Sequence, residues 1–296
     1  MAQAFLAQYA AGCFLAVTFA SIQSCSWKYL RLMAAVTLGI TFLSLLLLVR
    51  EPGWSDDAYR LPGVIGLGVA VVLASAWLVV NAAQGENVRK SQRVWPAAAG
   101  VVAMCAAVFL VLRPDPMLAA STNGAESATL SAPGMSSPAG AAPVTPRVTG
   151  RSGIQSAALV GTTVLGALLL GLVTASMLLG HRYLTDTDMP IAPLRRFTKL
   201  YVAAVVARIV WVAVASAPML ASSFQPTSDY TWFWVVVTVR VGVGLGATAV
   251  FAYMVWDCVR RRATQSATAL FYLSMVFVFL GELAGQYLVR TESLAV

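Results

Sequence analysis

Three ionisable side chains lie deep inside long apolar stretches of this sequence: Arg208, Arg240 and Glu282. An ionisable group in an apolar environment is costly, so it normally pairs with another group or serves a function. A buried carboxylate can accept a proton, and a buried guanidinium can hold an anion or a carbonyl oxygen. These three residues are therefore the first candidates for a functional site.

Arg240 and Glu282 are expected at similar depths on consecutive helices. With the helical rise per residue, Arg240 lies roughly 13 Å and Glu282 roughly 10 Å below the same surface. Consecutive helices often pack together, so we predict an Arg240–Glu282 ion pair. The pair has two interpretations: it only holds the two helices together, or Glu282 accepts a proton beside a bound ligand.

Further polar side chains fall near the same level. Gln8 lies close to the start of the first apolar stretch, and Gln286 is one helical turn beyond Glu282. With Arg240 they predict a ligand-binding site near one surface. Arg208 sits near the middle of its own stretch, where no acidic residue matches its depth. Backbone carbonyls, glutamine side chains, a water-filled cavity or an anionic or carbonyl-bearing ligand are its candidate partners.

His181 is the only histidine and ends another apolar stretch, in LLGHRYL. One histidine cannot supply both axial ligands of a bis-histidine haem, and the four cysteines form no CxxC pair. We therefore expect this chain to ligate no haem and no metal. His181 is either an interfacial residue with a polar flank or a proton-relay candidate.

The elements that position these residues must be membrane-spanning helices. Of the 296 residues, 59% are apolar and 11% are charged, against about 25% charged in soluble domains, and the mean hydropathy is +0.77. A soluble protein of this length could not bury so much apolar surface. This composition excludes an ordinary soluble enzyme, a nucleic-acid-binding or disordered protein, and a disulfide-stapled secreted protein.

Eight stretches are long and apolar enough to cross a bilayer. They are residues 3–23, 30–49, 62–83, 94–112, 155–180, 198–221, 231–255 and 266–289. The predicted fold is all-α, a polytopic transmembrane bundle of eight helices.

Basic residues fix the expected orientation of this bundle. Twelve of the 20 lie in the loops on one side and six on the other, and the loop between spans six and seven has none. By the positive-inside rule, both termini are outside. Residues 114–153 are rich in Ala, Ser, Pro, Gly and Thr, which predicts a flexible external linker. It separates two four-helix transmembrane halves, residues 1–113 and 154–296.

Two short stretches carry a family resemblance. The first span contains Gln8 and Gly12 in FLAQYAAGCF, and the last contains Gly281, Glu282 and Gly285 in LGELAGQYL. With eight helices and external termini, the chain resembles the membrane anchor subunits of dimethyl-sulfoxide-reductase and polysulfide-reductase type complexes. That family has a similar Gln-x-x-x-Gly pattern in an early helix and a Gly-Glu-x-x-Gly-Arg run in its last helices.

The resemblance implies a subunit of a respiratory electron-transfer complex in the bacterial inner membrane. Such anchors bind quinone or quinol without haem and exchange electrons with an iron–sulfur subunit, which connects them to a catalytic subunit. Glu282 would then be the proton acceptor, with Gln8, Arg240, Gln286 and Arg208 as candidate ligand-binding residues. Two other classes remain open: an ion or solute transporter, and a non-redox structural subunit whose buried charges only hold helices together.

Overall fold

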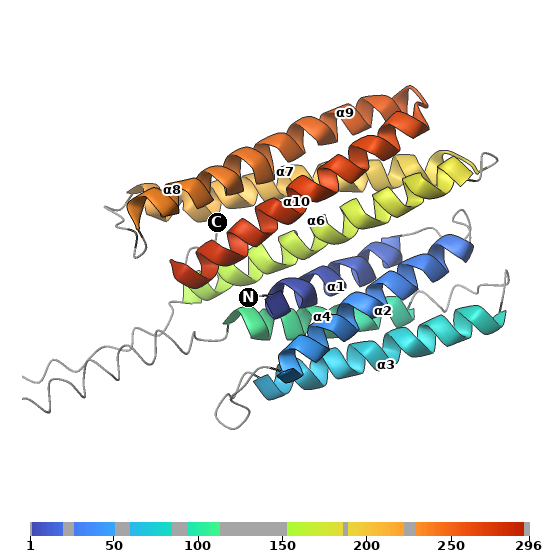
Figure 1. The fold of residues 1–296 in the computed structure, drawn as a ribbon, viewed down its shortest axis with the longest axis horizontal. Helices are drawn as coiled ribbons and strands as arrows, with labels where there is room; N and C mark the ends of the chain where they lie inside the picture. Colours follow the sequence, from blue (N-terminus) through green and yellow to red (C-terminus); the bar gives the residue numbers. More distant parts are fainter. Residues whose placement is uncertain are drawn as a thin grey trace, which may run out of the picture.

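The chain folds into a bundle of long helices that run nearly side by side (Figure 1). The structure is a computed structural model, which describes residues 2–19, 27–50, 60–84, 94–112, 153–185, 189–221, 226 and 229–292. The helices are α1 (Ala2–Phe19), α2 (Trp27–Arg50), α3 (Arg60–Gln84), α4 (Val94–Leu112), α6 (Gly153–Thr185), α7 (Ala192–Ala221), α8 (Tyr230–Thr238), η2 (Val239–Ala247), α9 (Thr248–Arg260) and α10 (Thr264–Thr291). The predicted linker falls outside the described residues, apart from Gly153.

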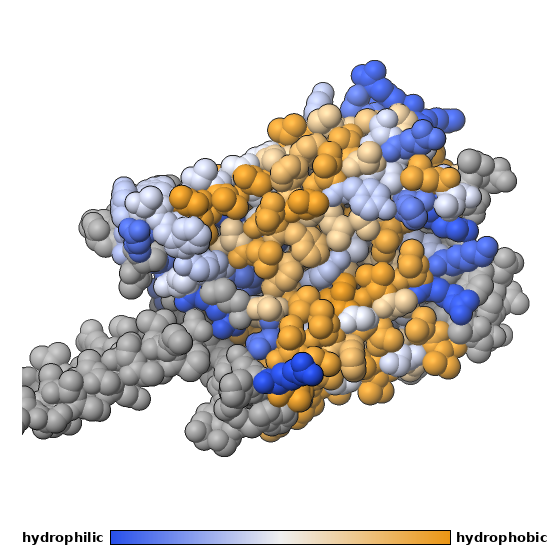
Figure 2. Space-filling view, in the orientation of Figure 1, coloured by the Kyte–Doolittle hydropathy of each residue, from blue (hydrophilic) through white to orange (hydrophobic). Residues whose placement is uncertain are grey.

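The helices have the length and surface of membrane spans. Seven passes are long and apolar enough to cross a bilayer, with α8, η2 and α9 forming one pass, and α4 adds the shorter apolar helix Pro96–Leu112. No described residue lies in a β-strand, which confirms the all-α prediction. Large apolar side chains such as Val72 and Val79 are more than 60% exposed. Figure 2 shows a broad apolar area on one face of the bundle, with hydrophilic side chains at both ends. The chain is thus a multi-pass membrane protein.

Two helices, α1 and α6, form the centre of the bundle. Their spans are 67% and 61% buried, whereas that of α7 is 22% buried. The two helices cross in direct backbone contact, because a Cβ at Gly171 would overlap the carbonyl of Gly12. This is the close approach that small residues permit in membrane helices. The contact joins the first four helices to the last four.

The seventh pass contains a π-helical segment, η2, between two α-helical parts. Its glycine-rich sequence VRVGVGLGA packs on α10, and a Cβ at Gly244 would overlap the backbone of Gly281. The three glycines of this segment are Gly242, Gly244 and Gly246. Only Gly244 meets another helix closely, since Gly242 has no atom within reach of an added Cβ and Gly246 meets only its own segment.

The sixth pass begins earlier than the sequence predicted. We expected it to start at residue 198, because two prolines precede that position, but α7 begins at Ala192. Pro193 lies in the first turn, where the missing amide proton costs no helical hydrogen bond. Since the number of passes is even, α1 begins and α10 ends at the same end of the bundle (Figure 1).

Candidate functional site

The polar centre of the molecule is a carboxylate held by two arginines. Glu282 on α10 receives two parallel hydrogen bonds from Arg208 on α7, Nε to Oε1 at 3.0 Å and Nη2 to Oε2 at 3.0 Å. This bidentate arrangement is the strongest form of an arginine–carboxylate contact. Arg208 also donates from Nη1 to the carbonyl of Thr162 on α6 at 3.0 Å. All three nitrogens of this guanidinium therefore have partners.

The second arginine is Arg240, in η2. Its Nη1 lies 3.1 Å from Oε1 of Glu282, which confirms the predicted Arg240–Glu282 pair. The close contact of Gly244 with α10 brings η2 near enough for this bond. The rest of the guanidinium lies against Gly285, where an added Cβ would come within 3.1 Å of the Arg240 Cζ.

Two glutamines extend the cluster to α1. Gln8 donates from Nε2 to Oε2 of Glu282 at 3.5 Å, a long contact, and its Oε1 accepts a bond from Nε2 of Gln286. Gln286 follows Glu282 by one turn of α10, so both side chains leave the same face of that helix. The structure thus brings together Gln8, Arg208, Arg240, Glu282 and Gln286, and we call these five residues the polar cluster.

The α6 backbone makes room for the polar cluster at a glycine. A Cβ at Gly166 would overlap Nε2 of Gln8 and Oε2 of Glu282. One turn earlier, Thr162 supplies its carbonyl to Arg208 and its hydroxyl to the Trp211 indole, which donates at 3.0 Å. Thr162, Gly166 and Trp211 were not predicted from the sequence. Small and hydroxyl-bearing residues within one turn of α6 are the signal that could have pointed to this position.

The polar cluster carries an uncompensated positive charge. Its five side chains are at most 5% exposed, and they comprise two guanidiniums and one carboxylate. Among the described residues, Nε and Nη2 of Arg240 and Oε1 of Gln286 have no hydrogen-bond partner. Buried polar groups are nearly always paired, so two free donors and one free acceptor beside a net cation indicate a place for a polar ligand or water.

Arg208 has an acidic partner, Glu282, that was not predicted from the sequence. Measured from residue 198 and residue 266, the predicted helix starts, Arg208 and Glu282 differ in depth by roughly 9 Å. Measured from the actual starts, Ala192 and Thr264, they differ by roughly 3 Å. The late predicted start of the sixth pass therefore hid the pair.

His181 lies apart from the polar cluster. It is exposed near the end of α6, about 22 Å along the helix from Gly166. Its Nδ1 is 3.3 Å from the hydroxyl of Tyr272, and the two rings meet edge to face. Within the part of the chain that the structure describes, no three His, Cys, Asp or Glu side chains gather as metal ligands would.

The fold and this cluster define an all-α multi-pass membrane protein with a buried, net cationic polar site assembled from four passes. Comparisons with family models, with characterised proteins and with solved structures found no match.

Proposed function

We propose that the chain is the integral membrane subunit of a respiratory electron-transfer complex in a bacterial inner membrane. In this proposal the polar cluster binds quinone or quinol, and an iron–sulfur partner subunit exchanges electrons with it. The observation that carries the proposal is the combination of free donors on Arg240 and a free acceptor on Gln286 in one buried cationic cluster. The resemblance of the first and last spans to anchor subunits points the same way.

The free groups of the polar cluster match the polar atoms of such a ligand. A quinone oxygen only accepts hydrogen bonds, and Nε and Nη2 of Arg240 are free to donate them. A quinol hydroxyl also donates, and Oε1 of Gln286 is free to accept. A preorganised positive site in an apolar environment also stabilises negative charge that develops on a ligand oxygen during reduction. The residues present therefore fit the ligand in both of its redox states.

Glu282 is the proposed proton acceptor, since it is the one carboxylate in the polar cluster. Its two oxygens receive bonds from Arg208, Arg240 and Gln8. A proton on Oε1 would compete with the donor from Arg240 and turn that guanidinium toward the ligand. In this way proton uptake and ligand contact would be linked through one side chain.

Gln286→Leu tests the proposal, because it removes the free acceptor and leaves both ion pairs intact. We expect the affinity for a quinol analogue with a free hydroxyl to fall about tenfold, the value of one hydrogen bond. The melting temperature should fall by only a few degrees, because the change also removes the bond from Gln286 to Gln8. The matched control is Gln3→Leu. Gln3 is a glutamine of α1 outside the polar cluster, and it donates to the backbone carbonyl of Leu47. Unchanged affinity in Gln286→Leu, or a purified complex that binds no quinone, would overturn the proposal. Full quinol oxidation by Glu282→Gln in the intact complex would remove the proton-acceptor role.

A transporter remains the second candidate because of η2. Helix irregularities in the middle of a span often mark functional sites, and interrupted helices line the binding sites of many transporters. Vesicles that contain only this chain separate the two ideas. Solute or anion uptake that Arg240→Gln abolishes would favour transport. A chain without uptake whose cluster variants change only stability would favour a structural subunit.

A further inference from the structure

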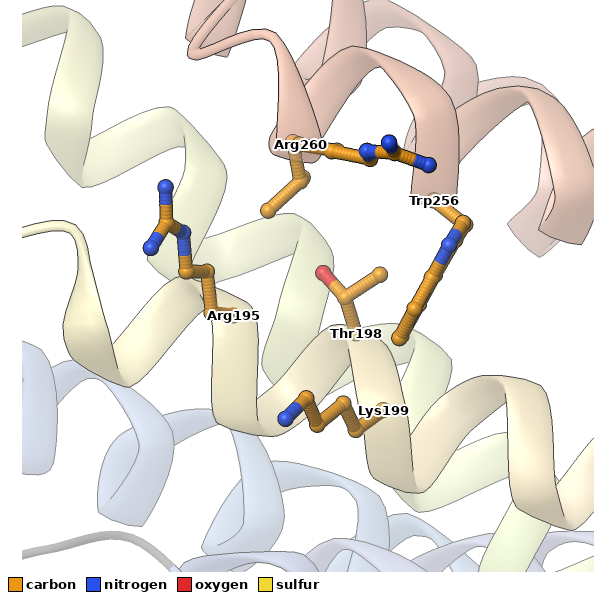
Figure 3. Close-up of a pocket in the computed structure, with 6 residues that line it drawn as sticks. Arg195, Thr198, Lys199, Trp256 and Arg260 are labelled. Atoms are coloured by element: carbon orange, nitrogen blue, oxygen red, sulfur yellow. The ribbon is translucent and has the colours of Figure 1, made fainter.

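A pocket opens between α7 and α9, away from the polar cluster. It lies at the opposite end of the bundle from the start of α1 and the end of α10. It has a volume of about 250 Å³. Arg195, Thr198 and Lys199 from the first turns of α7 line one wall, and Trp256 and Arg260 from the end of α9 line the other. Figure 3 shows these side chains around a common opening. By the positive-inside rule this end is cytoplasmic.

The mouth of this pocket is strongly basic. Arg195, Lys199 and Arg260 give it three positive charges, and no acidic residue is among those described as lining it. The only carboxylate in α7 and α9 belongs to Asp257, which already pairs with Arg261 at 2.7 Å. Three cations within one opening therefore lack a counter-charge from these two helices, and an anion would complement them.

An apolar groove continues from the pocket toward the middle of the membrane. It has a volume of about 360 Å³ and shares Trp256 with the basic mouth. Val202, Val206 and Ile209 of α7 line it on one side, and Ala249 and Tyr253 of α9 on the other. From Val202 to Ile209 it runs for roughly 10 Å along the helix, within the roughly 15 Å depth of one leaflet.

We propose that this combined surface is a binding site for one anionic phospholipid. The three cations and the hydroxyl of Thr198 face the headgroup phosphate, and one acyl chain lies in the groove beside Val206 and Ala249. Trp256 separates the two parts at the interface, where tryptophan is favoured. Basic pockets between helices on the cytoplasmic side have the chemistry that holds acidic headgroups. A free phosphate would leave the apolar groove without an occupant, so the groove favours a lipid.

The test measures lipids retained by the purified full chain in detergent, by native mass spectrometry and by thermal stabilisation. The probes are phosphatidylglycerol and phosphatidylcholine with identical acyl chains. We expect phosphatidylglycerol to bind at least about tenfold more tightly, since each cation near the surface adds to the attraction. The triple variant Arg195→Gln, Lys199→Gln and Arg260→Gln should lose this preference.

The matched control removes three exposed cations at the same end that do not line the pocket: Lys28→Gln, Arg196→Gln and Arg262→Gln. This variant has the same net charge as the first triple and should keep the preference. Ala249→Phe, which fills the groove and leaves the mouth intact, should weaken phosphatidylglycerol binding. If both triple variants lose the preference for phosphatidylglycerol equally, the effect comes from diffuse surface charge, and the proposed site is wrong. An Ala249→Phe variant with unchanged phosphatidylglycerol binding, or inorganic phosphate that binds as tightly as phosphatidylglycerol, would show an anion site without a lipid.

Discussion

Replacing Glu282 by Gln is the most informative single change in this molecule, because this carboxylate is the only negative charge in the polar cluster. Arg208 and Arg240 are 0% and 1% exposed and both bind it. The change raises the formal charge of the cluster from one to two positive charges. Arg208→Gln instead lowers it to zero, and leaves the Arg240–Glu282 pair in place. The two variants thus separate charge balance from simple loss of contacts.

The magnitude follows from the geometry of the polar cluster. Leaving one partner of a buried ion pair alone costs about 3–5 kcal/mol. Arg208 binds both oxygens of Glu282 and Arg240 shares Oε1 with it, so the two guanidinium groups lie close together. At a separation of roughly 6 Å and an effective dielectric constant of about 20 they repel by about 3 kcal/mol. Glu282→Gln exposes this repulsion, so we expect it to cost at least about 5 kcal/mol. Arg208→Gln relieves it, so its cost should be about 2 kcal/mol or less.

Thermal unfolding of the purified chain in detergent measures the difference. At about 2 °C per kcal/mol for a chain of this size, Glu282→Gln should melt at least about 10 °C below the wild type and Arg208→Gln about 4 °C below. Asp257→Asn is the control, because it neutralises an exposed carboxylate whose surface pair contributes little. The charge-balance account is refuted if Arg208→Gln melts lower than Glu282→Gln, or if Glu282→Gln behaves like Asp257→Asn.

Three further predictions concern the backbone. Gly171→Ala places a Cβ on the Gly12 carbonyl, so we expect about 3 kcal/mol of destabilisation, whereas Gly39→Ala, with no atom near its Cβ, should be neutral or stabilising in the same melting assay. Gly244→Ala should push η2 away from α10 and lower the melting temperature by several degrees, and crosslinking between the two helices should fall with it. Arg262 has a φ of 62°, so Arg262→Gly should raise stability by about 1 kcal/mol in denaturant titrations, and a loss would contradict the strained turn.

The eight spans were predictable because membrane insertion depends on a property that can be summed along the chain. Twenty or so apolar residues are needed to cross the hydrocarbon core, and each predicted stretch corresponds to a pass whose ends differ by at most six residues where both are described. The Arg240–Glu282 pair was predictable for a similar reason. Both residues lie a short distance from the same end of consecutive helices. The predicted helix ends from which their depths were counted differ from the observed ends by only one or two residues.

The bidentate contact of Arg208 was not predictable, because depth alone does not give the rotation of a helix or the tertiary neighbour that it faces. Arg208 and Glu282 are 74 residues apart, and the helix between them, from Tyr230 to Arg260, could have separated them. The π-helical segment was hidden too. Its sequence VRVGVGLGA is apolar and glycine-rich, which suits close helix packing in either helical form.

The polar cluster crosses the boundary between the two halves that composition suggests. Gln8 comes from α1, whereas Arg208, Arg240, Glu282 and Gln286 come from the last three passes. Because α1 meets α6 through backbone contact at Gly12, its position is fixed by the second half as well as by the first. The second half alone would leave Gln286 without its bond to Gln8 and open the polar cluster to lipid. The site therefore belongs to the whole chain, and ligand binding at it depends on the packing between the two halves.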